Sequence, residues 1–252
     1  MLFSIITVNL NNLAGLKETI SSILAQSFLD YEIIVVDGGS TDGSKEYIES
    51  IKNNKISFLY GPDNGIYDAM NKGIKYAKGE YYLFINSGDC LAGHDTLEKI
   101  ASSINGADML YGDTIIVSED GKKEFYKRAR EFKWKIYLLF THHQSIAYKS
   151  EVIKNKSIQY DQNYKVASDY AFTLKFVEQA RNIKRVSFPI SKFRLGGISS
   201  KSFLIGIKEN YLIRKKYINC NFLINLSLTI VSICSNLLRR YLKYFYRIIR
   251  YK

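Results

Sequence analysis

Three predicted β-strands each end near a polar residue that could bind a ligand. Asn9 follows the first apolar run, Asp37 ends the second, and Asp89 lies just beyond a later one. Parallel strands present their carboxyl ends at one edge of a sheet, where α/β proteins bind ligands, so the three side chains are expected to converge. Carboxylates at such an edge can accept hydrogen bonds from a base or ribose. One or two carboxylates can also hold a divalent cation that bridges phosphates.

These side chains require a sheet in which strands alternate with helices. Runs that suit buried strands are LFSIITV (2–8), YEIIVVD (31–37), KISFLYG (55–61) and EYYLFI (80–85). Helical spacing of apolar residues lies between them, at 13–26 and 66–79. This alternation predicts an α/β fold with a mostly parallel, Rossmann-like sheet flanked by helices.

Several protein classes are excluded. The turn after the first strand, NLNNLAG, contains neither G-x-G-x-x-G nor a P-loop, which argues against dehydrogenases and P-loop proteins. A hydrophobic fraction of 46% argues against disorder, and 252 residues suit one large domain with or without an appendage. Three cysteines without paired spacing favour a reducing compartment. The N-terminal residues are interpreted as a strand rather than a signal peptide.

In the second half of the chain, predicted strands and helices alternate less regularly. We expect a hairpin turning at 119–121 and a helix over 166–180, with Ser168 as its N-cap and Asp169 next to it. A carboxylate in a first turn is favoured by the helix dipole alone, so Asp169 has a structural as well as a catalytic interpretation. Pro62 and Pro189 are both expected in loops.

His142, His143 and Gln144 form a further polar cluster. On a strand, adjacent histidines point to opposite faces, so a zinc site built from both is not expected. A hydrogen-bonded core histidine is the alternative to a functional one.

In order, these segments resemble the family 2 inverting glycosyltransferases, especially the bacterial branch that builds surface polysaccharides. The matching pieces are FSIITVNLNN, AQSF, YEIIVVDGGSTDGS and GPDNGIYDAMNKGIKYAKGEYYLFINSGD, and the resemblance covers roughly residues 3–200. It implies the nucleotide-diphospho-sugar transferase (GT-A) fold. We accordingly assign 1–115 to a nucleotide-sugar-binding half, 116–200 to an acceptor-binding and catalytic half of the same domain, and 201–252 to a tail.

The resemblance also implies roles for individual residues. Positions that match the nucleoside and donor site are Thr7, Asn9, Asp37, Asp63, Gly65, Asp68, Asn71, Gly73, Asn86 and Asp89. His143 and Gln144 match a pair on the donor-sugar or acceptor side. A stretch that closes over the diphosphate is matched by Lys192, Arg194, Gly196 and Gly197.

Asp89 matches the last aspartate of the family's metal motif, which implies Mn²⁺ or Mg²⁺ as the cofactor. Asn86 and Gly88 stand where many members carry acids, so Asp89 remains as the one strong metal ligand. Asp169 matches the catalytic base, which takes the proton of the acceptor hydroxyl as it attacks the anomeric carbon. The metal offsets charge on the departing nucleoside diphosphate, and attack from the opposite face inverts the anomeric configuration.

Positive charge is concentrated in the tail. The whole chain carries +12, and residues 201–252 hold eleven Lys and Arg against one acid, Glu209, a net charge of +10. The apolar run 222–238 is followed by a basic stripe, which together are typical of an amphipathic helix lying on an anionic membrane surface. A helix pair docked on the body is the alternative.

A second basic-aromatic segment, 122–135, holds seven cations and two acids. It could contact phosphates, but without a nucleic-acid module we expect a solvated face and no nucleic-acid partner. Contact with a lipid diphosphate is a third interpretation.

Together these features predict a metal-dependent hexosyltransferase that uses a nucleotide-sugar donor, preferably of UDP, and a polyprenyl-diphosphate-linked saccharide acceptor. We expect it to lie peripherally on the inner, cytoplasmic face of a bacterial plasma membrane through residues 222–252. The alternatives are a nucleotidyltransferase, which needs a glycine-rich basic loop that is absent here, and a catalytically silent nucleotide-sugar or membrane-binding module.

Overall fold

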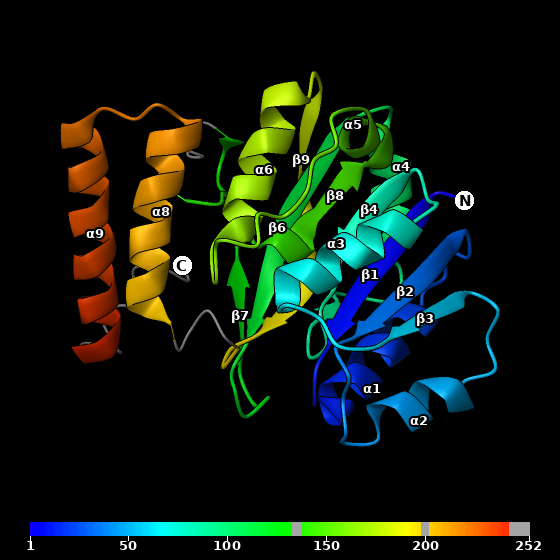
Figure 1. Ribbon diagram of the computed structural model, residues 1–252. Coiled ribbons are helices and arrows are strands. Elements are labelled where there is room, and N and C mark those ends of the chain that lie inside the picture. Colours follow the sequence, from blue (N-terminus) through cyan, green and yellow to red (C-terminus); the bar gives the residue numbers. More distant parts are fainter. Residues whose placement is uncertain (133–137, 198–201, 242–252) are drawn as a thin grey trace.

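The computed structural model describes residues 1–132, 138–197 and 202–241 (Figure 1). One sheet runs through the body in the order β3-β2-β1-β4-β8-β6-β9-β5, with β7 paired to β6. Its first half consists of β1 (Phe3–Asn9), β2 (Tyr31–Asp37), β3 (Ile56–Tyr60) and β4 (Tyr81–Phe84), all parallel. This half confirms the predicted strand and helix alternation.

The second half of the sheet corrects the prediction of a mostly parallel sheet. Its strands are β5 (Cys90–Leu91), β6 (Met109–Val117), β7 (Glu124–Lys127), β8 (Ile146–Lys149) and β9 (Ile183–Arg194). Only β6 and β9 are parallel there; β4 with β8, β6 with β8, β6 with β7, and β5 with β9 are antiparallel. The predicted hairpin at 119–121 joins β6 to β7. Apolar runs show which segments are buried but carry no direction, so the sequence pattern could not reveal the mixed sheet.

Pro189 is another correction, because it lies inside β9 rather than in a loop. It stands opposite Asp113, where the β6–β9 register shifts on both sides. A proline cannot donate to a strand ladder, and such an irregularity is where a sheet tolerates one.

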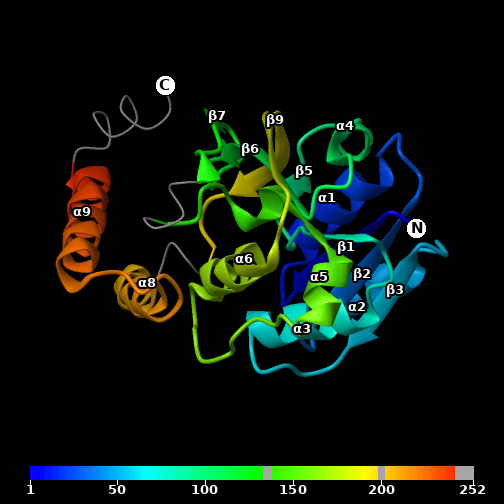
Figure 2. The ribbon, with the colours of Figure 1, turned by 90° about the horizontal axis from the view of Figure 1, so that it is seen from above.

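Alternate side chains of each strand enter two separate cores. Ile5 and Val35 pack with helices α1 (Leu13–Leu24), α2 (Ser44–Ser50) and α4 (Thr96–Ile104), whereas their neighbours Ile6 and Val36 pack with α3 (Ile66–Tyr76), α5 (Ser150–Asn155) and α6 (Ser168–Gln179). Figure 2 shows α1 and α4 on one face of the sheet and α3, α5 and α6 on the other. This arrangement follows from the two-residue period of a strand.

Two further helices lie beside α6. Helix α8 (Phe203–Tyr217) places Ile213, which is fully buried, against Ala167 and Tyr170 in a third small core. Helix α9 (Phe222–Tyr241) lies on the far side of α8 (Figure 1). No helix within the described residues combines the length and the apolar content that crossing a membrane requires. Of the predicted basic stripe, residues 242–252 lie outside the described residues.

Candidate active site

The carboxyl ends of β1 and β2 are joined by a direct hydrogen bond. Asn9 Nδ2 donates to Asp37 Oδ2 at 2.7 Å and to Ser40 Oγ at 3.2 Å. The other Asp37 oxygen, Oδ1, accepts the backbone N–H groups of Gly39 and Ser40, at 3.0 and 2.6 Å. Asp37 is fully buried and shapes this turn, in which Gly39 has a φ of 92° that favours glycine. Its contact with a nucleoside stays a prediction.

Asp63 lies against the same turn. A Cβ at Gly38 would come within 2.5 Å of Asp63 Oδ2, so only glycine leaves the carboxylate this space. Oδ1 of Asp63 accepts the backbone N–H of Gly65 at 2.9 Å, in the loop that leads to α3. Asp42, by contrast, accepts hydrogen bonds from the backbone N–H groups of Leu13 and Ser44 and therefore fixes two helix starts.

Asp68 and Asn71, on α3, contact the segment before α6. Asp68 forms an ion pair with Lys72 at 3.1 Å and accepts a hydrogen bond from Gln162 at 3.2 Å. Asn71 donates to the Tyr160 carbonyl and accepts from the Tyr160 N–H, both at 2.9 Å. Both ends of the Asn71 amide are thus used to hold the chain in place, and its contact with a donor stays a prediction.

Asp89, which follows β4, is buried at 6% exposure. Its Oδ2 accepts a hydrogen bond from Gln144 Nε2 at 2.7 Å, and its Oδ1 accepts one from the Arg194 N–H at 3.1 Å. Burial raises the pKa of Asp89 to about 6, although these hydrogen bonds and the charges of His143 and Arg194 oppose the shift. The ionised Asp89 carboxylate therefore destabilises the folded protein, and a cation bound beside it would reduce this destabilisation.

His143 lies close to both Asn86 and Asp169. Its Nε2 lies 3.5 Å from Asn86 Nδ2, and its Nδ1 lies 3.4 Å from Asp169 Oδ2. His143–Ser145 is a short 3-10 helix and not part of a strand, because β8 begins only at Ile146. This corrects the predicted strand; in the 3-10 turn, His143 faces Asp169 while Gln144 reaches Asp89.

Asp169 stands in the first turn of α6 with 21% of its side chain exposed. Its Oδ1 accepts the N–H of Tyr170 at 2.8 Å, and Oδ2 faces His143. The predicted helix is confirmed, but its N-cap is Ala167, and Ser168 is the first helical residue. Ser168 does not act as the predicted N-cap, and its buried hydroxyl forms no hydrogen bond with a described residue.

Several of the predicted site residues carry a buried oxygen atom without a hydrogen-bond partner. Among the described residues these atoms include Thr7 Oγ1, Asn9 Oδ1, Asn86 Oδ1 and Gln144 Oε1. Buried polar atoms are normally paired, so unpaired ones at a strand edge indicate a polar ligand. No group of three or more His, Cys, Asp or Glu residues with metal-binding geometry occurs in the described ranges. The donor set, one carboxylate beside amide oxygens, fits a hard cation that keeps waters and phosphates as its other ligands.

Lys192 and Arg194 lie in β9. Lys192 forms an ion pair with Glu124 at 2.8 Å, and Arg194 forms one with Glu18 at 2.6 Å. Their contact with a diphosphate stays a prediction. Gly196 has a φ of 108°, so a glycine turn follows the strand as expected.

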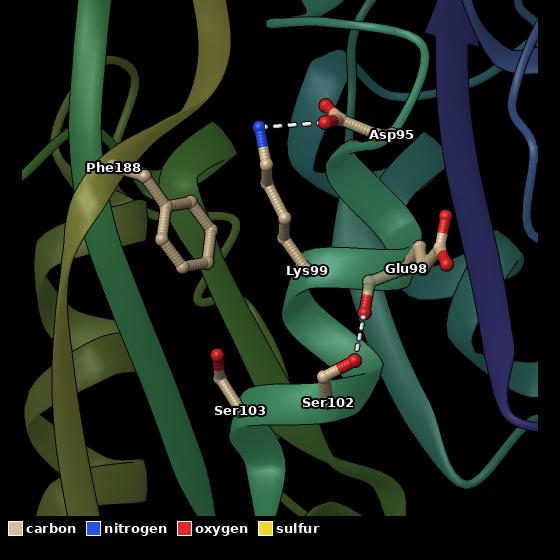
Figure 3. Close-up of a pocket in the computed structure, with 6 residues that line it drawn as sticks. All are labelled: Asp95, Glu98, Lys99, Ser102, Ser103 and Phe188. Carbon is tan, nitrogen blue, oxygen red and sulfur yellow. Dashed lines mark hydrogen bonds and ion pairs between the residues drawn. The ribbon is translucent and has the colours of Figure 1, made fainter.

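A hollow of about 390 Å³ lies elsewhere, between α4 and β9 (Figure 3). Its lining consists of Asp95, Glu98, Lys99, Ser102, Ser103 and Phe188. Lys99 is held by Asp95 at 2.7 Å, and Ser102 donates to the Glu98 carbonyl. None of the predicted site residues lines it, so the strand ends remain the candidate active site.

The structure adds contacts that the motifs did not reveal. Ser40 bonds to Asn9 and to the Asn11 N–H, and Asn12 reaches the Ser87 carbonyl, which ties the ends of β1, β2 and β4 together. The strongest missed residue is Glu209 of α8, whose carboxylate accepts backbone N–H groups just before Asp169. The feature of the sequence that could have indicated Glu209 is that it is the single acid of a strongly cationic tail.

Comparison with known proteins identifies the family of this chain. The sequence profile of the family described as Glycosyl transferase family 2 matches residues 4–170. A PGL/p-HBAD biosynthesis glycosyltransferase of Mycobacterium bovis is 30% identical over 215 residues, which is 79% of each chain. The poly(ribitol-phosphate) beta-N-acetylglucosaminyltransferase TarS of Staphylococcus aureus is 27% identical over 74% of this chain and 34% of its own.

Solved structures share the fold. TarS residues 1–349 in complex with UDP-GlcNAc superpose with a TM-score of 0.68 at 22% identity, over 97% of this chain and 73% of that one. The mannosyltransferase PcManGT of Pyrobaculum calidifontis, in complex with GDP-Man and Mn²⁺, gives 0.67 at 14% identity, over 95% and 75%. The family profile over residues 4–170 and the relative that is 30% identical show that the chain belongs to glycosyl transferase family 2 and is a glycosyltransferase, with the GT-A fold of the solved structures.

Proposed function

We propose that this enzyme transfers a sugar from a UDP-sugar to a lipid-linked saccharide, with the help of a divalent metal, in the synthesis of a bacterial surface polysaccharide. The observation that supports this most is the row of side chains from Asp37 and Asn9 through Asp89 and His143 to Asp169. In this proposal, oxygen atoms at one end of the row bind the donor, and Asp169 at the other end is the base for the acceptor.

Asp169 is the proposed general base. Its partly exposed carboxylate can take the proton of an acceptor hydroxyl, and the contact with His143 holds one oxygen in a fixed direction. The hydrogen bond from the Tyr170 N–H fixes the other oxygen. A carboxylate held at both oxygens is oriented before the acceptor arrives, which favours proton transfer in the inverting attack.

Asp89 is the proposed metal ligand, with the unpaired amide oxygens of Asn86 and Gln144 beside it. A Mn²⁺ or Mg²⁺ ion there would neutralise charge on the departing nucleoside diphosphate. The hydrogen bonds from Gln144 and Arg194 keep the Asp89 carboxylate facing the site. PcManGT, the relative solved with Mn²⁺, supports this part of the proposal.

UDP is the proposed nucleotide because TarS was solved with UDP and with UDP-GlcNAc. PcManGT holds GDP-Man instead, so the shared fold accepts more than one nucleotide. The test is calorimetric titration with UDP, GDP and dTDP, each with and without Mn²⁺. We expect Mn²⁺ to enhance binding of UDP, and Asp89→Ala to abolish that enhancement. Failure of all three nucleotides to bind would contradict the proposal.

Attachment to the inner face of the plasma membrane is proposed from α9. Its Asn225 is buried against α8, but Leu223, Ile230 and Val231 on other faces are half exposed or more, Leu223 to 69%. Exposed apolar side chains on a helix that precedes a basic segment are typical of interfacial binding. Figure 1 shows α9 ending on the side of the molecule toward which β1 points, so a bilayer on that side would be near the strand ends.

A further inference from the structure

Helix α8 reaches the active site through one buried carboxylate. Glu209, 7% exposed, accepts the backbone N–H of Lys165 on Oε1 at 2.7 Å. Its Oε2 accepts the N–H groups of Val166 and Ala167, both at 2.9 Å. These three residues form a strap, residues 165–167, that leads directly into α6. A single side chain more than forty residues away in the sequence therefore holds the entry to that helix.

The strap has no local substitute for this carboxylate. A helix leaves its first N–H groups without intrahelical partners, and a side chain at the N-cap normally satisfies one of them. Here the N-cap is Ala167, which has no side-chain acceptor, and the Ser168 hydroxyl bonds to no described residue. A negative charge at a helix N-terminus is also favoured by the helix dipole. The three N–H groups that Glu209 accepts all precede Ser168, the first helical residue, so Glu209 pairs the strap itself and places a negative charge at the start of α6.

Asp169 comes two residues after the strap, so the backbone that Glu209 fixes also sets the position of the Asp169 carboxylate. Buried Tyr67 lies beside the same turn: backbone hydrogen bonds from Ser168 and Asp169 reach its hydroxyl, whose pKa is raised by burial and by the charges of Asp169 and Glu209. Displacement of a catalytic group by about 1 Å can cost about 10²-fold in rate.

The rest of α8 keeps Glu209 in place. Ile213, one helical turn later, is buried against Ala167 and Tyr170. Arg214 is buried as well and donates to Asn225 at 2.7 Å and to Thr229 at 2.9 Å, which joins α8 to α9. Figure 1 shows α8 between α6 and α9. Helix α8 is therefore fixed on both sides, although it lies beyond the residues that the family profile matches.

We infer that Glu209 is a positioning residue of the transferase, which holds the strap 165–167 and through it the catalytic base Asp169. The inference rests on the proposed role of Asp169. It makes α8 a working part of the catalytic domain as well as the start of the tail.

The test compares Glu209→Gln with Glu178→Gln, the same chemical change at an exposed position of α6. Glutamine keeps the shape of Glu209 but turns an NH₂ donor toward at least one backbone N–H. For each full-length variant, kcat and KM are measured with a panel of UDP-sugars as UDP release, together with the Kd for UDP. Hydrogen exchange by mass spectrometry follows the peptide that contains the strap.

We expect Glu209→Gln to lower kcat about 10- to 100-fold, with the donor KM and the UDP Kd within twofold of wild type, because the donor residues lie on other elements. Exchange in the strap should accelerate, and Glu178→Gln should change none of these. If Glu209→Gln fails to fold, Glu209→Asp, which keeps the charge on a shorter side chain, is measured in the same way. A kcat within twofold of wild type, or unchanged exchange in the strap, would overturn the inference. Wild-type protein without any transfer would contradict the proposed function, while the exchange data would still decide whether Glu209 holds the strap.

Discussion

Replacing Asp89 by asparagine measures the cost of burying a charge at the strand ends. The folded protein holds the pKa of Asp89 at about 6, against an ordinary value of 3.8, chiefly because of burial. Asparagine has the same shape and no charge. Its Oδ1 can accept from the Arg194 N–H, and its Nδ2 can donate to Gln144 if that amide turns over, since Gln144 Oε1 has no partner among the described residues. The substitution therefore removes the charge while keeping both contacts.

The sign of the effect follows from the raised pKa. A carboxyl group whose pKa is higher in the folded state favours folding when protonated, so its contribution to stability is full below about pH 4 and is lost as the pH rises through 6. Two pKa units at about 1.36 kcal/mol each give about 3 kcal/mol as an upper value. For a chain of this size, about 2 kcal/mol raises Tm by roughly 4 to 8 °C.

Thermal unfolding at a series of pH values, in EDTA, measures this difference. At pH 7.5 we expect Asp89→Asn to unfold several degrees above wild type, and near pH 4 the two should coincide. Mn²⁺ with UDP should stabilise the wild type alone, because the variant lacks the proposed ligand. Equal Tm values at pH 7.5, or a difference that does not depend on pH, would show that the buried charge of Asp89 does not destabilise the folded protein.

Three further predictions concern separate parts of the molecule. Asp169→Asn should lower kcat by about 10²- to 10⁴-fold in a UDP-release assay and leave the Kd for UDP unchanged; full activity would exclude it as the base. Asn71→Ala leaves the backbone N–H and C=O of Tyr160 unpaired, so chemical denaturation should show a loss of about 2 to 4 kcal/mol, and a loss below 1 kcal/mol would show that the pair is dispensable. The double variant Leu223→Glu/Val231→Glu should bind anionic liposomes at least tenfold more weakly in a flotation assay while keeping Tm within about 2 °C; unchanged binding would contradict attachment through α9.

The first half of the fold could be predicted from the sequence because local patterns carry it. Strands β1 to β4 are short apolar runs with helical spacing between them, and their polar ends follow from parallel topology. Asn9 and Asp37 do meet, at 2.7 Å. The second half depends on strand direction, which side-chain patterns do not encode, so the antiparallel pairing of β8 remained hidden.

Site contacts that depend on tertiary packing could not be predicted. Nothing in the local sequence shows that Gln144 forms a hydrogen bond with Asp89. The same holds for the hydrogen bond between Asn71 and Tyr160, which are 89 positions apart. Ser168 is a residue type that often caps helices, but α6 begins one residue earlier than that role requires, with Ala167 as the N-cap. The contact of Glu209 with residues 165–167 joins segments more than forty positions apart, so no local pattern reveals it.

The carboxyl ends of the strands are proposed to hold the nucleotide, and Asp89 to hold the metal. The most direct test is a crystal structure of the protein grown with UDP and Mn²⁺, with anomalous data that locate the manganese. We expect one manganese peak bound by the Asp89 carboxylate, with the diphosphate beside it and Asp169 facing the open side. Manganese and UDP bound elsewhere, as in the hollow beside α4, or a nucleotide site that excludes Asp89, would contradict it.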